Sequence, residues 1–297
     1  MTNSTNNPWS EPRLAHVQCL GARGLHRMAY WEWGDPASRR VLVCVHGVSR
    51  QGRDFDVLAR AMRGEFRVVC PDVVGRGESD RLADPAGYLL PTYGADMVTL
   101  LARLDADSVA WVGTSMGGLI GVGLAAMPGS PIVRLVINDI GPTIDAAGLV
   151  RIGDYLGQPL TWASEDEAAD YLLTISQGFG PHSREQWLAF TRPMLRKDGD
   201  RIRLHYDPAI GVPLRAVTPA AASAGEAALW AAYDAIRCPT LVLRGAESDV
   251  LAPATAAAMA ARGPKARVHE FAGVGHAPTI VAPDQVAVVR EFLQEGA

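Results

Sequence analysis

The sequence predicts an α/β protein in which helices cover both faces of a mostly parallel sheet. Short apolar runs alternate with helical patterns through most of the 297 residues. Fully apolar strands of this length are typical of a parallel sheet that is buried on both sides. A Gly-x-Ser-x-Gly turn over residues 113–117 lies where one apolar run gives way to a helix. In sheets of this class, functional groups gather at the carboxyl ends of the strands.

The first half of the chain supplies most of the predicted strands. Residues 15–33 hold two strand-like stretches around a glycine turn, which predicts a hairpin. Further apolar runs predict strands over residues 41–45, 66–70, 108–113 and 132–138. Helical patterns between them predict helices over residues 54–63, 92–104 and 116–127.

The alternation stops near Gly141 and resumes near Pro239. The intervening residues are rich in aromatic, proline and charged residues, with helical patterns over 161–175, 184–195 and 220–232. We therefore expect residues 141–235 to form an inserted, mostly helical cap (lid). The core domain is expected over residues 15–140 and 236–297, and it is completed by strands at 240–244 and 267–271 and helices at 253–262 and 283–294. Residues 1–14 are expected to be disordered.

The composition makes several classes of partner improbable. The net charge is −4 and no basic run follows the chain, so nucleic acid is not an expected partner, and neither is an anionic membrane. The polar first residues lack a signal-peptide pattern, which favours a cytoplasmic protein. The four cysteines form no CxxC pair and stand at no ligand spacing from a histidine, so we expect reduced thiols, with no metal and no cofactor. The sequence leaves open whether the protein forms a homo-oligomer.

Ser115 is the predicted nucleophile. The turn Gly113-Thr114-Ser115-Met116-Gly117 follows an apolar strand directly and opens an apolar helix. This context is what a nucleophile turn requires, because the chain must reverse sharply and glycines avoid collision with nearby backbone. The serine oxygen would then stand exposed at the head of a helix, where the dipole favours negative charge.

His276 is the predicted general base. It lies in Gly273-Val274-Gly275-His276, just past the carboxyl end of the last predicted strand. A serine hydroxyl needs such a base to accept its proton. The other histidines after Ser115 fall in the predicted cap or, for His269, within a strand.

Two aspartates could orient this base, and both follow predicted strands. Asp249 and Asp139 each fit the chain order Ser, Asp, His, so the order does not decide between them. We expect Asp249, because its loop with Ser and Glu neighbours has room to reach the histidine. Asp139 is the alternative acid; beside Gly141-Pro142 it would more naturally hydrogen-bond the turn into the cap.

Two backbone N–H groups are candidates for the oxyanion hole. One belongs to Met116, the residue after the nucleophile, and the other to Val48 in the loop after the strand at residues 41–45. His46 in this loop is expected to be a hydrogen-bonding brace, and Arg50, Arg53 and Asp54 are expected to pair and hold the loop. The alternative for Arg50 is that it faces the pocket and meets an acidic substrate group. The glycine-rich stretch 72–79 lacks the Gly-Lys-Ser/Thr ending of a phosphate-binding loop, so we expect a structural role for it.

Together these segments resemble the α/β-hydrolase superfamily, in its serine-nucleophile branch of carboxylesterases, enol-lactonases and C–C bond hydrolases. The resemblance rests on His46-Gly47, the 72–79 loop, the elbow at 113–118, Asp249 and His276. It implies an eight-stranded, mostly parallel sheet flanked by helices, with a helical cap insertion after the sixth strand. It also implies acyl-enzyme chemistry on a small-molecule ester or related carbonyl substrate, with water as the second substrate.

Three functions remain open at the level of sequence. We expect a carboxylic-ester hydrolase for small or medium acyl substrates, with an apolar pocket under the aromatic cap. A C–C hydrolase of a ring-cleavage diketone, or an enol-lactonase, is the alternative; the diketone would need arginines such as Arg151, Arg192 and Arg196 at the pocket. A ligand receptor on a hydrolase scaffold belongs to another class and would show negligible turnover.

Overall fold

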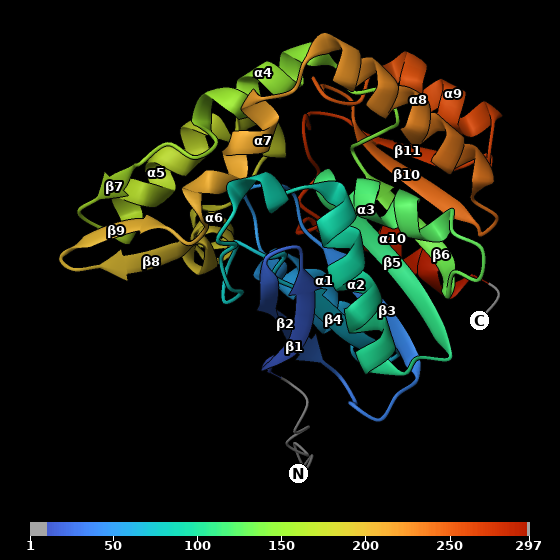
Figure 1. The fold of residues 1–297 in the computed structure, drawn as a ribbon, viewed down its shortest axis with the longest axis horizontal. Helices are drawn as coiled ribbons and strands as arrows, with labels where there is room; N and C mark the ends of the chain where they lie inside the picture. Colours follow the sequence, from blue (N-terminus) through green and yellow to red (C-terminus); the bar gives the residue numbers. More distant parts are fainter. Residues whose placement is uncertain (1–10, 296–297) are drawn as a thin grey trace.

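The chain is built around one eight-stranded sheet in a computed structural model that describes residues 11–295 (Figure 1). The strand order is β1-β2-β4-β3-β5-β6-β10-β11. Strands β1 and β2 form an antiparallel hairpin, β2 is antiparallel to β4, and all later neighbours are parallel. The predicted fold class is therefore confirmed. The strands are β1 (Arg13–Gly21), β2 (Gly24–Trp33), β3 (Arg40–Val45), β4 (Arg67–Pro71), β5 (Ser108–Thr114), β6 (Ile132–Asn138), β10 (Thr240–Gly245) and β11 (Arg267–Phe271).

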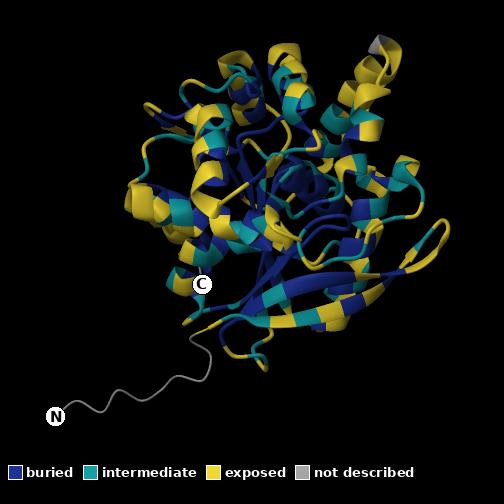
Figure 2. Cartoon of the chain, turned by 90° about the vertical axis from the view of Figure 1, so that its left-hand side faces the viewer, coloured by how far each residue is buried: buried dark blue, intermediate teal, exposed yellow. Residues whose placement is uncertain are grey.

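The central strands are buried on both faces, which explains their continuous apolar sequence. Side chains alternate between two apolar cores along a strand. In β3, Val41 and Val43 belong to one core, and Leu42 and Cys44 belong to the other. The first core lies under α2 (Leu90–Leu104), α3 (Met116–Ala125) and α9 (Pro253–Ala261), and the second under α1 (Asp56–Met62) and α10 (Pro283–Gln294). Figure 2 shows the buried strands inside the layer of partly exposed helices.

The chain leaves the sheet after β6 and returns at β10. The segment between them contains helices and a small sheet that together form an arch beside and above the main sheet (Figure 1). The small sheet has the order β7-β9-β8. Its strands and the helices of this segment are α4 (Ala146–Tyr155), β7 (Thr161–Trp162), α5 (Glu165–Ile175), α6 (Arg184–Thr191), β8 (Leu195–Asp198), β9 (Arg201–Leu204), α7 (Val212–Arg215) and α8 (Pro219–Ala235).

Two helices expected in this segment are shorter than predicted. The helix predicted over residues 161–175 begins at Glu165, because Ser164 caps it and residues 161–162 pair with β9. The helix predicted over residues 184–195 ends at Thr191, before Pro193. The chain then forms the β8–β9 hairpin, whose turn holds Gly199 at a φ of 63°.

The first strand begins near the start of the described residues, at Arg13. The disorder expected for residues 1–14 falls mostly on residues outside the described range, while Arg13 and Leu14 belong to β1. Among residues 11–295, every helix is too short or too polar to cross a bilayer.

Candidate active site

Ser115 occupies a strained turn between β5 and α3. Its backbone has φ 51° and ψ −116°, a conformation that side-chain-bearing residues rarely adopt. The two flanking glycines make this turn sterically feasible. A Cβ at Gly113 would collide with the Gly117 carbonyl group, and a Cβ at Gly117 would collide with the Val45 carbonyl group. The sequence therefore folds here into a turn that presents the serine oxygen at the carboxyl end of the sheet.

His276 lies within hydrogen-bonding distance of this serine. Its Nε2 is 3.1 Å from Ser115 Oγ. The loop that carries His276 follows β11 and is hydrogen-bonded to the segment after α5, since Gly275 N–H donates to the Gly178 carbonyl oxygen at 2.6 Å. The structure thus brings together the two residues that the sequence paired across 161 positions.

Asp139, rather than the expected Asp249, contacts the histidine. Asp139 Oδ2 lies 2.8 Å from His276 Nδ1. Strand register explains this position: Thr114 on β5 pairs with Asn138 on β6, so the residues that follow, Ser115 and Asp139, emerge side by side. The carboxylate is fully buried and also accepts hydrogen bonds from Gly245 N–H at 2.8 Å and Ser248 Oγ–H at 2.6 Å.

The hydrogen bonds assign a direction to each contact of His276. A carboxylate oxygen only accepts, so His276 Nδ1–H donates to Asp139. The Nε2 atom is then the acceptor that faces the Ser115 hydroxyl. A serine hydroxyl, an imidazole and a buried carboxylate in this order form a catalytic triad, in which the imidazole exchanges the proton with the serine and the carboxylate orients the imidazole.

Asp249 is engaged elsewhere, and the expectation that it would orient His276 is corrected. Its two oxygens accept from Arg151 Nε at 2.5 Å and Nη2 at 2.9 Å. The Arg151 guanidinium lowers the pKa of this carboxyl. Because Arg151 belongs to α4, the Asp249 carboxylate is paired with the inserted segment, although it lines the same cavity as His276. The sequence held no signal for this pairing, since it depends on where α4 lies.

The loop after β3 passes directly beside the nucleophile. A Cβ at Gly47 would lie 3.7 Å from Ser115 Cβ, and both Val48 and Met116 line one apolar cavity. Arg76 holds this loop in place by donating its Nε–H to the Val48 carbonyl oxygen at 2.9 Å. The N–H groups at the start of α3, including that of Met116, have no partner within the helix. This placement is consistent with the two expected oxyanion donors.

His46 braces the same loop. Its Nδ1–H donates to the Gly47 carbonyl oxygen at 2.7 Å, and its Nε2 accepts from Val73 N–H at 2.9 Å. Burial without a counter-charge lowers the pKa of His46 to about 3, so the ring stays neutral. The role expected from the sequence, a structural brace, fits these contacts.

Arg50 and Asp72 also hold loops near the site. Arg50 pairs with Asp54 through two hydrogen bonds of 2.6 and 2.7 Å, and its guanidinium lies 4.0 Å from the Phe190 ring centre. Asp72 accepts from Gly52 N–H at 2.7 Å and Glu78 N–H at 2.9 Å. These contacts leave the 72–79 loop with the structural role expected for it.

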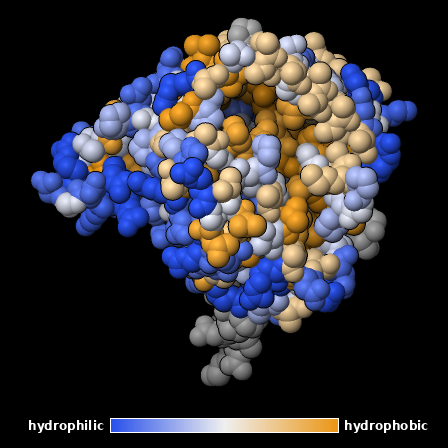
Figure 3. All heavy atoms as spheres, in the orientation of Figure 1, coloured by the Kyte–Doolittle hydropathy of each residue, from blue (hydrophilic) through white to orange (hydrophobic). Residues whose placement is uncertain are grey.

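Two cavities lie next to residues of the candidate site. The first has a volume of about 520 Å³ and is mostly apolar. It lies between α2, α3 and the inserted helices, where Figure 3 shows apolar atoms lining a hollow. Besides Val48 and Met116, its lining includes Leu119, Leu149, Leu214 and Leu229. An apolar cavity of this size suits an acyl chain.

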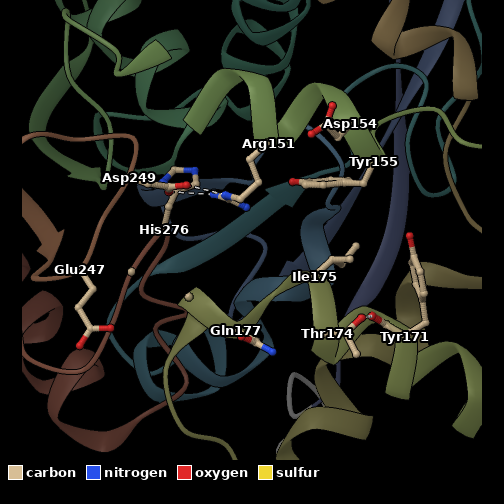
Figure 4. A pocket seen from close by; sticks show the side chains of 12 residues that line it. Arg151, Asp154, Tyr155, Tyr171, Thr174, Ile175, Gln177, Glu247, Asp249 and His276 are labelled. Carbon is tan, nitrogen blue, oxygen red and sulfur yellow. Dashed lines mark hydrogen bonds and ion pairs between the residues drawn. The ribbon is translucent and has the colours of Figure 1, made fainter. Parts of the chain in front are cut away.

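The second cavity has a volume of about 600 Å³ and opens on the other side, at His276. Arg151, Tyr155, Ile175 and Asp249 contribute to its lining (Figure 4). Arg151 was only a candidate for a carboxylate-bearing substrate in the sequence, while Tyr155 was not singled out. Arg192 pairs with the exposed Glu165, and Arg196 lies near His205; neither lines this cavity.

The sheet order, the strained serine turn and the hydrogen-bonded Ser-His-Asp arrangement define an α/β hydrolase. A model of the alpha/beta hydrolase family matches residues 42–289, and the chain belongs to this family.

Similar proteins are known as sequences and as structures. A 3-hydroxybutyrate-oligomer hydrolase from Cupriavidus necator is 53% identical, with 95% of this chain and 98% of that protein covered. The esterase YbfF from Escherichia coli is 26% identical, with 86% of this chain and 93% of that protein covered. A hydrolase structure from Rickettsia typhi has a TM-score of 0.87 at 28% identity and covers 96% of this chain and 100% of its own. An alpha/beta hydrolase structure from Novosphingobium aromaticivorans has a TM-score of 0.85 at 33% identity and covers 96% of this chain and 99% of its own.

These findings confirm the class of enzyme expected from the sequence. The chain is an ester-cleaving α/β hydrolase. Its substrates are an ester and water.

Proposed function

We propose that this protein is a serine esterase that hydrolyses short oligomers of 3-hydroxybutyrate. The hydrogen-bonded series Ser115, His276 and Asp139 is the single observation that supports the serine mechanism. The substrate class is supported by the relative from Cupriavidus necator, which is similar over nearly its whole length. An oligomer of a hydroxy acid is held together by ester bonds, which suits a site of this kind.

The first half of the reaction forms an acyl-enzyme. Ser115 Oγ attacks the ester carbonyl carbon while its proton passes to His276 Nε2, 3.1 Å away. The N–H groups of Val48 and Met116 stabilise the negative charge that develops on the carbonyl oxygen. The carbon–oxygen bond of the alcohol then breaks, and His276 returns the proton to the departing alcohol oxygen.

The second half restores the enzyme. Water attacks the acyl carbon, His276 Nε2 takes a proton from it, and the bond to Ser115 Oγ breaks as that oxygen recovers a proton. In both halves the imidazole carries a positive charge for a short time. Asp139, buried and 2.8 Å away, stabilises this charge and holds the ring in the required tautomer.

Hydrolysis of 3-hydroxybutyrate dimer and trimer by the purified chain and its Ser115→Ala variant tests the proposal. We expect the wild type to release 3-hydroxybutyrate and the variant to lose at least about a thousandfold in kcat. Ser130→Ala is a matched control. Ser130 Oγ accepts a hydrogen bond from Ile132 N–H at the amino end of β6, the opposite end of the strand from the reacting groups. Equal turnover by the wild type and Ser115→Ala would contradict the mechanism. Absence of oligomer cleavage alongside turnover of p-nitrophenyl butyrate would contradict the substrate class alone.

A further inference from the structure

We infer that Arg151, assisted by the Tyr155 hydroxyl, binds the free carboxylate of the departing hydroxy acid, so that the enzyme shortens an oligomer from its carboxyl end. This inference rests on the proposed function and assigns a direction to the substrate in the same site. The two cavities differ in chemistry: His276 lines the polar cavity, and Val48 and Met116 line the apolar one.

The catalytic groups decide which half of the substrate enters which cavity. The acyl carbonyl must lie at the oxyanion donors, and Val48 and Met116 line the apolar cavity. The departing oxygen must lie at His276, which lines the polar cavity. The acyl half therefore extends into the apolar cavity, and the alcohol half lies in the polar one.

The two halves of a hydroxybutyrate oligomer match these surroundings. The acyl half ends in a neutral hydroxyl group and carries methyl groups. The alcohol half ends in a carboxylate, and in the terminal unit only a CH and a CH₂ group separate this carboxylate from the departing oxygen. A cation for that carboxylate must therefore lie close to His276.

Arg151 is placed to supply this cation. Among the described residues that line the polar cavity, it carries the one guanidinium or ammonium group. Its bonds to Asp249 use Nε and Nη2, so the N–H groups of Nη1 remain for a ligand. Its side chain is 39% exposed, which leaves it accessible from the cavity. Guanidinium groups match the planar geometry of carboxylates.

The neighbours of Arg151 strengthen this assignment. In Figure 4 the Tyr155 hydroxyl points toward the Arg151 guanidinium, beside His276, whereas the carboxylates of Asp154 and Glu247 point away from it. A phenol and a guanidinium that face one cavity together offer donors to both carboxylate oxygens. Asp249 fixes Arg151 in place and also offsets part of its charge, so the preference for an anion should be moderate.

The first test compares 3-hydroxybutyrate dimer with the methyl ester of the same dimer. The wild type should favour the free acid by about tenfold in kcat/KM, mainly through KM. Arg151→Gln should bring this ratio close to one, and Arg151→Lys should keep part of it. Arg192→Gln, a charge-matched change on an exposed residue outside the cavity, should leave the ratio unchanged. A wild-type ratio of one, or an unchanged ratio in Arg151→Gln, overturns the inference.

A second set of variants separates binding from an indirect effect on His276. Removal of Arg151 leaves the Asp249 carboxylate without its partner near the imidazole, which alters catalysis on every substrate. Asp249→Asn keeps the cation and removes the competing anion, so the free-acid preference should rise. The double variant Arg151→Gln/Asp249→Asn should lose the preference again. Equal ratios in Asp249→Asn and in the double variant would contradict a binding role for Arg151.

Product analysis tests the direction itself. A trimer labelled with ¹³C in its carboxyl-terminal unit should release labelled monomer and unlabelled dimer at early times. Release of unlabelled monomer first, or of both monomers equally, overturns the inference. These outcomes are distinct from failure of the proposed function, in which the wild type cleaves neither the dimer nor its methyl ester.

Discussion

Asp139 Oδ2 lies 2.8 Å from His276 Nδ1, although 137 residues separate them in the chain. The contact exists because β6 lies next to β5, so that the aspartate leaves the sheet beside the serine. Asp139 is fully buried and receives two further hydrogen bonds, which hold it in one orientation. Asp249, in contrast, is partly exposed and tied to Arg151.

Asp139→Asn should lower kcat for p-nitrophenyl butyrate by about a thousandfold or more, because an amide cannot stabilise the imidazolium and favours the wrong tautomer. Asp249→Asn should lower it by less than about tenfold. Steady-state kinetics on both variants checks the ranking. The reverse ranking would restore Asp249 to the role that the sequence suggested.

Gly117→Ala should abolish activity and lower the yield of folded protein, since its Cβ would overlap the Val45 carbonyl group. Gly123→Ala on the same helix is the matched control, because a Cβ at that position would have no described atom within 4 Å apart from its chain neighbours and the nearby backbone of its own helix. The control should leave activity intact and stabilise the fold by up to about 1 kcal/mol, as alanine favours helix. Thermal unfolding and an esterase assay measure both effects. Similar behaviour of the two variants would contradict the steric account of the serine turn.

His46 should make the fold sensitive to acid. Its pKa falls from 6.5 to about 3 on burial, so between these values the unfolded chain binds a proton that the folded chain does not. The free energy of unfolding therefore decreases as the pH falls from 6.5 toward 3, because protonation of His46 favours the unfolded chain. Between pH 6.5 and 5 the expected decrease is about 2 kcal/mol. Urea unfolding of the wild type and His46→Gln across this range isolates the effect. Parallel pH profiles for the two proteins would show that His46 titrates normally.

Leu149→Trp should shift substrate preference toward short acyl chains, because Leu149 lines the apolar cavity. We expect kcat/KM for p-nitrophenyl octanoate to fall by about tenfold and that for the acetate to change little, as added volume excludes the longer chain. Val150→Trp is the control, since Val150 is on the same helix, 65% exposed and outside the cavity. An equal loss on acetate and octanoate would mean that the acyl chain binds elsewhere.

The sequence predicted the sheet, and the closeness of Ser115 and His276, for a physical reason. Strands such as 41–45 and 108–113 are apolar throughout because both faces are buried, and this pattern is readable without a structure. Ser115 and His276 stand in glycine-bounded loops at strand ends, where the local sequence already indicates an exposed functional group.

The acid and the lining of the cavities depend on contacts between distant segments. Both Asp139 and Asp249 follow strands, and only the register of β5 with β6 decides that Asp139 meets the histidine. Arg151 and Tyr155 approach the site because α4 lies across it, and no local pattern encodes that position. The small sheet β7-β9-β8 was missed for a different reason: β7 has two residues, and β8 is mostly exposed, so neither carries an apolar pattern.

The hydrogen bond from Gly275 N–H to the Gly178 carbonyl oxygen has a mechanical consequence. It fastens the backbone next to the general base to the segment that borders the polar cavity. The position of the imidazole relative to the serine therefore depends on where that segment lies, and the inserted segment and the catalytic pair are connected through one backbone contact.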